Sequence, residues 1–102
     1  MSTLPASFDP AAPGAPALIV VKADWCGHCK TFVPEVKRMR PHLRARVYVV
    51  DGDADPRVKG WKVEGYPTVL FRPAAGGLFR YDGGDRSLAA LQRFMAAVSR
   101  RD

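Results

Sequence analysis

Two cysteines, three residues apart, stand where a strand-like segment gives way to a helix-like one. Residues 17–21 form a short apolar run rich in β-branched residues, which is typical of a strand buried on both faces. Cys26 and Cys29 follow it, and beyond them apolar residues recur at helical spacing at Phe32, Val36, Met39 and Leu43. The pattern therefore predicts that the pair lies at the N-terminus of a helix, with Cys26 nearest the end.

The later segments predict a mixed sheet. Apolar runs predict strands over 47–50, 68–71 and 78–81, and the last two are joined by a Pro/Gly-containing turn that favours an antiparallel hairpin. Between the first two of these strands, Asp55-Pro56 is typical of a helix start. A final helix has Ser87 as its cap and an apolar face made of Leu88, Leu91, Phe94, Met95 and Val98.

The resulting order, β-α-β-α-β-β-α, predicts an α/β domain with a four-stranded mixed sheet flanked by helices. A chain of 102 residues fits one domain. Residues 1–16 carry four prolines among alanines and glycine, so they are predicted to be a Pro/Ala-rich leader that precedes a domain over 17–102.

Charge and hydropathy limit the partners. The net charge is +6, but lysines and arginines are scattered without a purely basic run, so nucleic acid is not favoured as a partner. No charged n-region precedes the first apolar run, and that run is far shorter than the ~20 residues of a membrane span. We therefore expect a cytoplasmic protein that does not bind membranes, and nothing in the sequence suggests an oligomer.

The setting of the cysteines favours redox chemistry. The thiolate is the nucleophile in disulfide exchange, and a helix N-terminus stabilises negative charge. His28, when protonated, would further stabilise a thiolate at Cys26. Cys29 is close enough in sequence to resolve a mixed disulfide that Cys26 forms. The sequence therefore predicts a redox-active disulfide between Cys26 and Cys29.

Three alternatives remain for a two-cysteine motif of this kind. Structural zinc takes four ligands, and this chain has two cysteines and two histidines, with His28 poorly placed between the pair. An iron–sulfur cluster would need four thiolates and therefore two chains. A purely structural disulfide would close a loop too short to contribute much stability. No metal or cofactor is therefore expected.

The motifs together resemble the thioredoxin superfamily over roughly residues 17–100. The segment Trp25-Cys26-Gly27-His28-Cys29 is similar to the active-site segment of that family, with the Cys-Gly-His-Cys core typical of protein disulfide isomerase domains. Pro34 stands where the family bends its active-site helix, and Gly65-Tyr66-Pro67-Thr68 resembles the loop with a cis-proline. Gly83 resembles the glycine that follows the hairpin.

The resemblance implies a role for each matched residue. Cys26 would be the exposed nucleophile, Cys29 the buried resolving cysteine, and Pro67 a cis-proline facing them. An extended substrate segment would pair with the backbone beside Pro67 as an added strand. The substrate groove would be lined by Trp25, Gly65, Tyr66, Pro67 and Gly83.

The sequence departs from the family pattern in two places. The usual first strand and helix are replaced by the leader, which makes this a minimal version of the fold. The buried acid that many members keep six residues before the nucleophile is replaced by Val20. Because that acid is thought to move the proton of the resolving cysteine, its loss puts efficient turnover in question.

The predicted function is that of a protein dithiol–disulfide oxidoreductase, acting in electron transport and cell redox homeostasis through a mixed-disulfide intermediate. Its partners would be disulfide-containing proteins and a recycling reductase or glutathione. The direction of exchange is left open: reduction, oxidation or isomerisation. Two alternatives are a glutathione-linked, glutaredoxin-like enzyme and a thioredoxin-fold binding or processivity subunit with vestigial redox chemistry.

Overall fold

Four strands form one mixed sheet in the computed structural model, which describes residues 3–100. The sheet order is β2-β1-β3-β4, with bounds β1 (Ala17–Lys22), β2 (Arg46–Asp51), β3 (Thr68–Arg72) and β4 (Phe79–Arg80). β1 runs parallel to β2 and antiparallel to β3, and β4 pairs antiparallel with β3. The predicted four-stranded mixed sheet and its hairpin are therefore confirmed.

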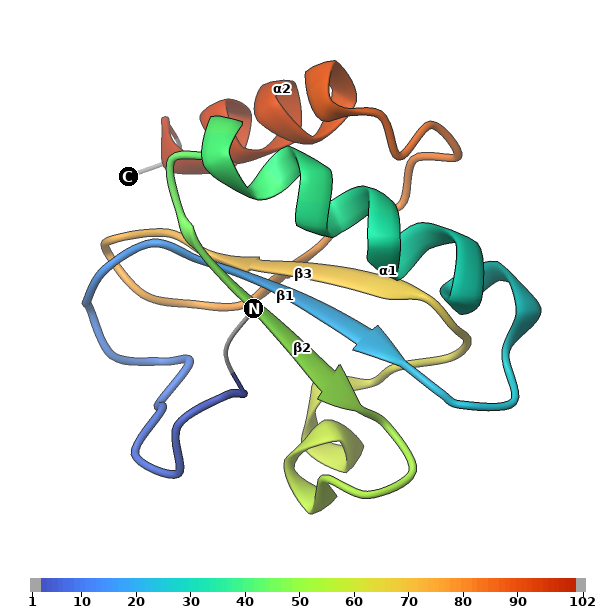
Figure 1. Ribbon diagram of the computed structural model, residues 1–102. Helices are drawn as coiled ribbons and strands as arrows, with labels where there is room; N and C mark the ends of the chain where they lie inside the picture. The colour runs from blue at the N-terminus through green and yellow to red at the C-terminus, as the bar shows by residue number, and fades with distance from the viewer. Residues whose placement is uncertain (1–2, 101–102) are drawn as a thin grey trace.

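Two helices, α1 (Gly27–Met39) and α2 (Leu88–Ser99), cover one face of this sheet (Figure 1). Each directs an apolar stripe onto the strands, because its apolar residues recur every three or four positions. The resulting core contains Leu18, Val20, Phe32, Val36, Val69, Phe71, Leu91 and Met95. Ser87 caps α2 as predicted, since its hydroxyl oxygen accepts a hydrogen bond from the Ala90 N–H at 3.3 Å.

The opposite face is covered by η2 (Pro56–Trp61), a 3₁₀-helix, and by residues of the leader. Ile19, Val21 and Leu70 of the sheet pack there with Leu4, which is buried, and with Phe8, which is half-buried. η2 starts at the predicted cap, because the Asp55 carboxylate accepts a hydrogen bond from the Arg57 N–H at 3.0 Å. Both faces of the sheet are thus covered, which explains why residues 17–21 of β1 are all apolar.

One buried arginine, Arg72 at the end of β3, holds the leader against the sheet. Its guanidinium donates hydrogen bonds to the carbonyl oxygens of Asp9, Ala12 and Ala15 at 3.2, 2.9 and 2.7 Å. It also lies 4.9 Å from the centre of the Phe8 ring. The prolines that keep the leader out of the sheet leave its carbonyl oxygens without strand partners, and Arg72 supplies donors for three of them.

β4 and α1 are shorter than the sequence pattern predicts, whereas β1, β2 and β3 are one or two residues longer. β4 is limited to Phe79–Arg80, although Phe79 does pair with Phe71 across the hairpin. α1 ends at Met39 and continues as a short 3₁₀-helix, η1 (Arg40–His42), because Pro41 cannot donate the hydrogen bond that would prolong the α-helix. Across residues 3–100, no helix is both long and apolar enough to cross a membrane.

Candidate active site

The two cysteines lie at the N-terminus of α1, just beyond the end of β1. Cys26 is the N-cap residue, with extended backbone angles, and its sulfur accepts a hydrogen bond from the backbone N–H of Cys29 at 3.3 Å. Both thiols are free and both are buried, with Cys26 6% and Cys29 2% exposed. The buried Cys29 agrees with the family resemblance, but the exposed Cys26 that it implied is wrong, because Cys26 packs with Ala23 and Tyr66. The Cys26 Sγ also lies 3.5 Å from the carbonyl oxygen of Tyr66, to which the thiol can donate.

The environment moves the pKa values of the two thiols in opposite directions. The pKa of Cys26 is lowered, first by a hydrogen bond from the Cys29 thiol and then by the backbone N–H groups of Cys29 and His28, against partial desolvation. The pKa of Cys29 is raised, first by burial and then by its hydrogen bond to Cys26. This difference in pKa favours Cys26 as the attacking thiolate and Cys29 as the thiol that stays protonated until it resolves the mixed disulfide.

A cation that the sequence does not single out, Arg86, also favours the Cys26 thiolate through its charge. It lies in the loop before α2, and its guanidinium is 5.8 Å from the centre of the Phe32 ring in α1. Because Arg86 is far from Cys26 along the chain, no local motif would have indicated it. By contrast, the imidazole of His28 is exposed, and His28 acts on Cys26 through its backbone N–H.

The Tyr66–Pro67 peptide bond is cis, as the family resemblance implied. Gly65, Tyr66 and Pro67 line a groove together with Gly83 and Arg86. A Cβ at Gly83 would collide with the Tyr81 hydroxyl, which donates to the Asp85 carbonyl oxygen, so a larger residue there would displace the Tyr81 side chain. The groove thus brings together four of the five predicted substrate-binding residues.

Trp25, the fifth of them, lies beside the dithiol but does not line this groove. It is 70% exposed, and its indole Nε1 donates to the Asp53 carboxylate at 2.8 Å. Its ring meets that of Tyr66 edge to face, with centroids 5.6 Å apart. Gly52 makes room for this arrangement, since a Cβ there would collide with the Tyr66 ring. An exposed, oriented indole of this kind provides a contact surface next to Cys26.

Val20 is fully buried within the core beneath α1, and its isopropyl group offers Cys29 no ionisable partner. The charged side chain that acts on Cys29 is instead Lys22, two residues further along β1. Lys22 is paired with the Asp24 carboxylate at 2.5 Å and with Asp51 at 3.7 Å. Within residues 3–100, no three His, Cys, Asp or Glu side chains gather closely enough to hold a metal ion.

Comparison with known proteins places this fold and site in a family. The thioredoxin family model matches residues 5–97, so the chain belongs to the thioredoxin family. It is 38% identical over 90 residues to a mitochondrial thioredoxin domain-containing protein of Schizosaccharomyces pombe, covering 79% of this chain and 25% of that protein. It is 36% identical over 80 residues to protein disulfide-isomerase 2-3 of Arabidopsis thaliana, covering 74% of this chain and 18% of that protein.

Solved structures agree with this assignment. The first thioredoxin domain of mouse protein disulfide-isomerase A4 superposes with a TM-score of 0.70 at 29% identity, covering 86% of this chain and 66% of that one. A mutant thioredoxin from Halobacterium salinarum gives a TM-score of 0.69 at 25% identity, covering 84% and 76%. The fold is therefore the thioredoxin fold. The chain spans a quarter or less of the length of these two relatives. One of them is named as a mitochondrial protein, and the cytoplasmic location of this chain stays a prediction.

Proposed function

We propose that this chain is a protein dithiol–disulfide oxidoreductase in which Cys26 attacks and Cys29 resolves. The observation that carries this proposal is the asymmetry of the pair: Cys26 caps α1 with a lowered pKa, and Cys29 is more deeply buried with a raised one. A structural disulfide needs no such asymmetry. An exchange reaction does, because one thiol must ionise to attack while the other stays protonated until the resolving step.

In the reducing direction, the Cys26 thiolate attacks one sulfur of a substrate disulfide. The substrate S–S bond breaks, a bond forms between Cys26 and the substrate, and the second substrate sulfur leaves as a thiolate that takes up a proton. Cys29 then loses its proton and attacks the Cys26 sulfur, which releases the first substrate sulfur. The substrate gains two electrons, and the enzyme is left with a disulfide between Cys26 and Cys29.

The groove beside the cis-proline supports an extended polypeptide as substrate. The Tyr66 carbonyl oxygen lies 3.5 Å from Cys26 Sγ, so a chain that pairs with the backbone near Pro67 would carry its disulfide to the nucleophile. Trp25, whose ring meets that of Tyr66, and Arg86, which lines the groove, would contact that chain. The oxidised enzyme would be returned to the dithiol by a reductase that supplies two electrons, or by two molecules of glutathione that supply one electron each and leave as glutathione disulfide.

Reduction of insulin disulfides with dithiothreitol, run beside a glutathione-coupled assay, tests the proposal. We expect activity with insulin that is lost in Cys26→Ser, and a trapped mixed disulfide with substrate in Cys29→Ser. Activity confined to the glutathione assay would indicate a glutaredoxin-like enzyme instead. A folded protein that is inactive in both assays would contradict the proposal and favour a binding subunit.

A further inference from the structure

The outer edge of β2 is open and lies among arginines. β2 is the edge strand of the sheet, and within residues 3–100 it pairs with β1 alone (Figure 1). The hydrogen bonds from Arg46 N–H to Pro16 O and from Gly52 N–H to Lys22 O fix which residues of β2 face β1. Because alternate residues of a strand point their backbone groups to opposite edges, Val47 and Val49 present theirs outward.

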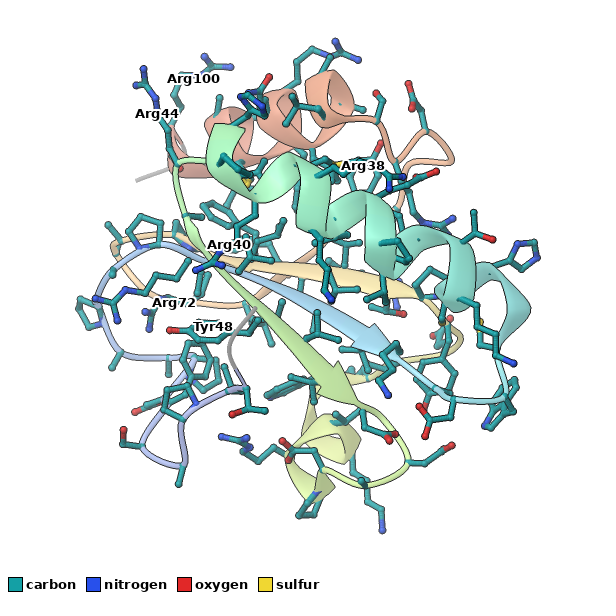
Figure 2. The ribbon with its side chains drawn as sticks, in the orientation of Figure 1. Arg38, Arg40, Arg44, Tyr48, Arg72 and Arg100 are labelled. Atoms are coloured by element: carbon teal, nitrogen blue, oxygen red, sulfur yellow. The ribbon has the colours of Figure 1, made fainter. Side chains whose placement is uncertain are left out.

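The charged side chains that lead into this edge and begin it are positive, whereas Asp51 at its far end is paired with Lys22. Residues 36–50 contain five lysines and arginines and no aspartate or glutamate, and four of the five are the exposed arginines Arg38, Arg40, Arg44 and Arg46. None of the four makes an ion pair with another residue of the described range 3–100. Figure 2 shows Arg40 and Arg44 near the start of β2, with Arg100 at the end of α2 beside Arg44.

These arginines lie on both sides of the strand edge. Arg44 lines a hollow on the helical side, together with Gln92 and Met95 of α2. Arg46 lines a hollow on the leader side with Tyr48, and it shares a further hollow with Arg40 along residues 45–48. An extended peptide that pairs with Val47 and Val49 would direct alternate side chains to both sides, where acidic residues would meet guanidinium groups.

We propose that the outer edge of β2 is a docking site for an extended acidic segment of a partner protein, which adds to the sheet as a fifth strand. Backbone pairing gives the segment its register, and the arginines select its charge. A second copy of this chain is a poor occupant, because two such edges would bring like charges together. A nucleic acid would use the arginines but could not pair with the strand.

The arginines of this site are remote from the dithiol, which makes their contribution separable from the proposed function. The dithiol is at the N-terminus of α1 and the arginines gather at its other end, so its 13 residues place them about 20 Å apart. Variants of these arginines are therefore expected to leave the alkylation rate of Cys26 unchanged, which gives them an internal control for folding. Val49 pairs with Val20 of β1, so the folding of Val49→Pro is checked by circular dichroism instead.

The first test uses the full reduced chain and a fluorescein-labelled peptide, acetyl-Thr-Glu-Glu-Val-Glu-Glu-Thr-amide, followed by anisotropy at low salt. As a strand, this peptide directs glutamates to both faces of the sheet. We expect saturable binding that weakens as salt is added. Two further peptides have the same sequence and charge. One is N-methylated at its odd-numbered residues and the other at its even-numbered residues, so each lacks the N–H groups along one edge of the strand. One methylated peptide should bind at least tenfold more weakly than the parent peptide, and the affinity of the other should stay within threefold of it. The reason is that only one of the two sets of N–H groups faces β2. Equal binding of both, or no binding of the parent peptide at 1 mM, would overturn the proposal.

The second test changes the protein. Arg40→Glu/Arg46→Glu should weaken peptide binding at least tenfold, and the matched Lys59→Glu/Arg93→Glu, with the same net charge, should stay within threefold. Val49→Pro removes an outward N–H that β1 does not use, and it should weaken binding at least fivefold. If a 12-nucleotide single-stranded DNA bound more tightly than the peptide and were insensitive to Val49→Pro, the surface would be a phosphate site. A dimer that disappears in Val49→Pro would identify a second copy as occupant, and either result would refute an acidic partner segment.

Discussion

Replacement of Arg72 by methionine tests whether the leader is part of the stable domain. Methionine keeps the length and apolar stem of the side chain but removes its charge and its donors. The variant therefore loses the three hydrogen bonds to Asp9, Ala12 and Ala15 and the contact with the Phe8 ring. The prediction is lower stability with an intact dithiol, because none of these groups contacts Cys26.

The magnitude follows from the contacts of the guanidinium. Asp9 and Ala15 are exposed, so water can replace part of what they lose, and each lost hydrogen bond costs about 1 kcal/mol. Loss of the cation–π contact adds about 0.5–1 kcal/mol. The buried Nε of Arg72 has no hydrogen-bond partner in the described residues, so its removal by methionine stabilises the folded state by about 1 kcal/mol. The net loss is about 2–3 kcal/mol, which for a domain of this size lowers Tm by about 10–20 °C.

Thermal unfolding followed by circular dichroism measures this change, with Arg72→Lys as the matched control. Lysine keeps the charge but presents one ammonium group in place of the planar fork, so its Tm should lie between those of the unchanged protein and Arg72→Met. Deletion of residues 1–16 should destabilise the protein more than Arg72→Met, since it also uncovers Ile19, Val21 and Leu70. A shift below about 3 °C in Arg72→Met, less than a single kcal/mol would cause, would refute the reasoning and support a domain that begins at residue 17.

Four further predictions concern the dithiol. Limiting iodoacetamide at pH 6 should modify Cys26 before Cys29, because the pKa of Cys26 is lowered and that of Cys29 is raised. The alkylation rate of Cys26 should rise with pH and reach half its maximum below the ordinary thiol pKa of about 8.5. Peptide mapping that finds Cys29 modified first would reverse the assignment. Arg86→Gln should shift that pH–rate profile upward, since it removes a positive charge that favours the thiolate, whereas Arg93→Gln, on the exposed side of α2, should leave it in place. Val20→Glu should speed the stopped-flow resolution of a mixed disulfide by Cys29 and lower Tm, because it buries a carboxyl group at a fully buried position; an unchanged rate would mean that another group already moves the proton. The redox potential, measured in glutathione buffers, should lie at roughly −230 to −180 mV, above the value of about −270 mV for thioredoxin, if His28 stabilises the reduced form. His28→Pro should lower it, and an unchanged potential in that variant would show that the exposed imidazole does not set it.

The local features of this protein could be predicted from its sequence because their causes are local. The β-branched run at 17–21, the helical spacing after Cys29 and the caps at Asp55 and Ser87 each depend on residues within a few positions of one another. The dithiol at a strand-to-helix junction is local in the same sense. These features were enough for the fold class, since the order of elements restricts a short chain to few topologies.

Tertiary structure decided everything that depends on segments far apart in the chain. Cys26 and Cys29 are the same residue type, and their pKa values are separated by burial, their mutual hydrogen bond and the backbone N–H groups and charge that surround Cys26. Arg86 reaches the dithiol because the loop before α2 folds back beside α1, which no spacing in the sequence indicates.

The leader and the basic stretch illustrate the same limit. The prolines predicted a segment outside the sheet, but its attachment depends on Arg72, which sequence alone shows only as one more charge at the end of a strand. Likewise, residues 36–50 look like an ordinary solvated basic segment until the sheet order makes β2 an open edge. The physical reason is common to both: burial, charge and hydrogen bonding are set by neighbours in space, and the chain selects those neighbours only when it folds.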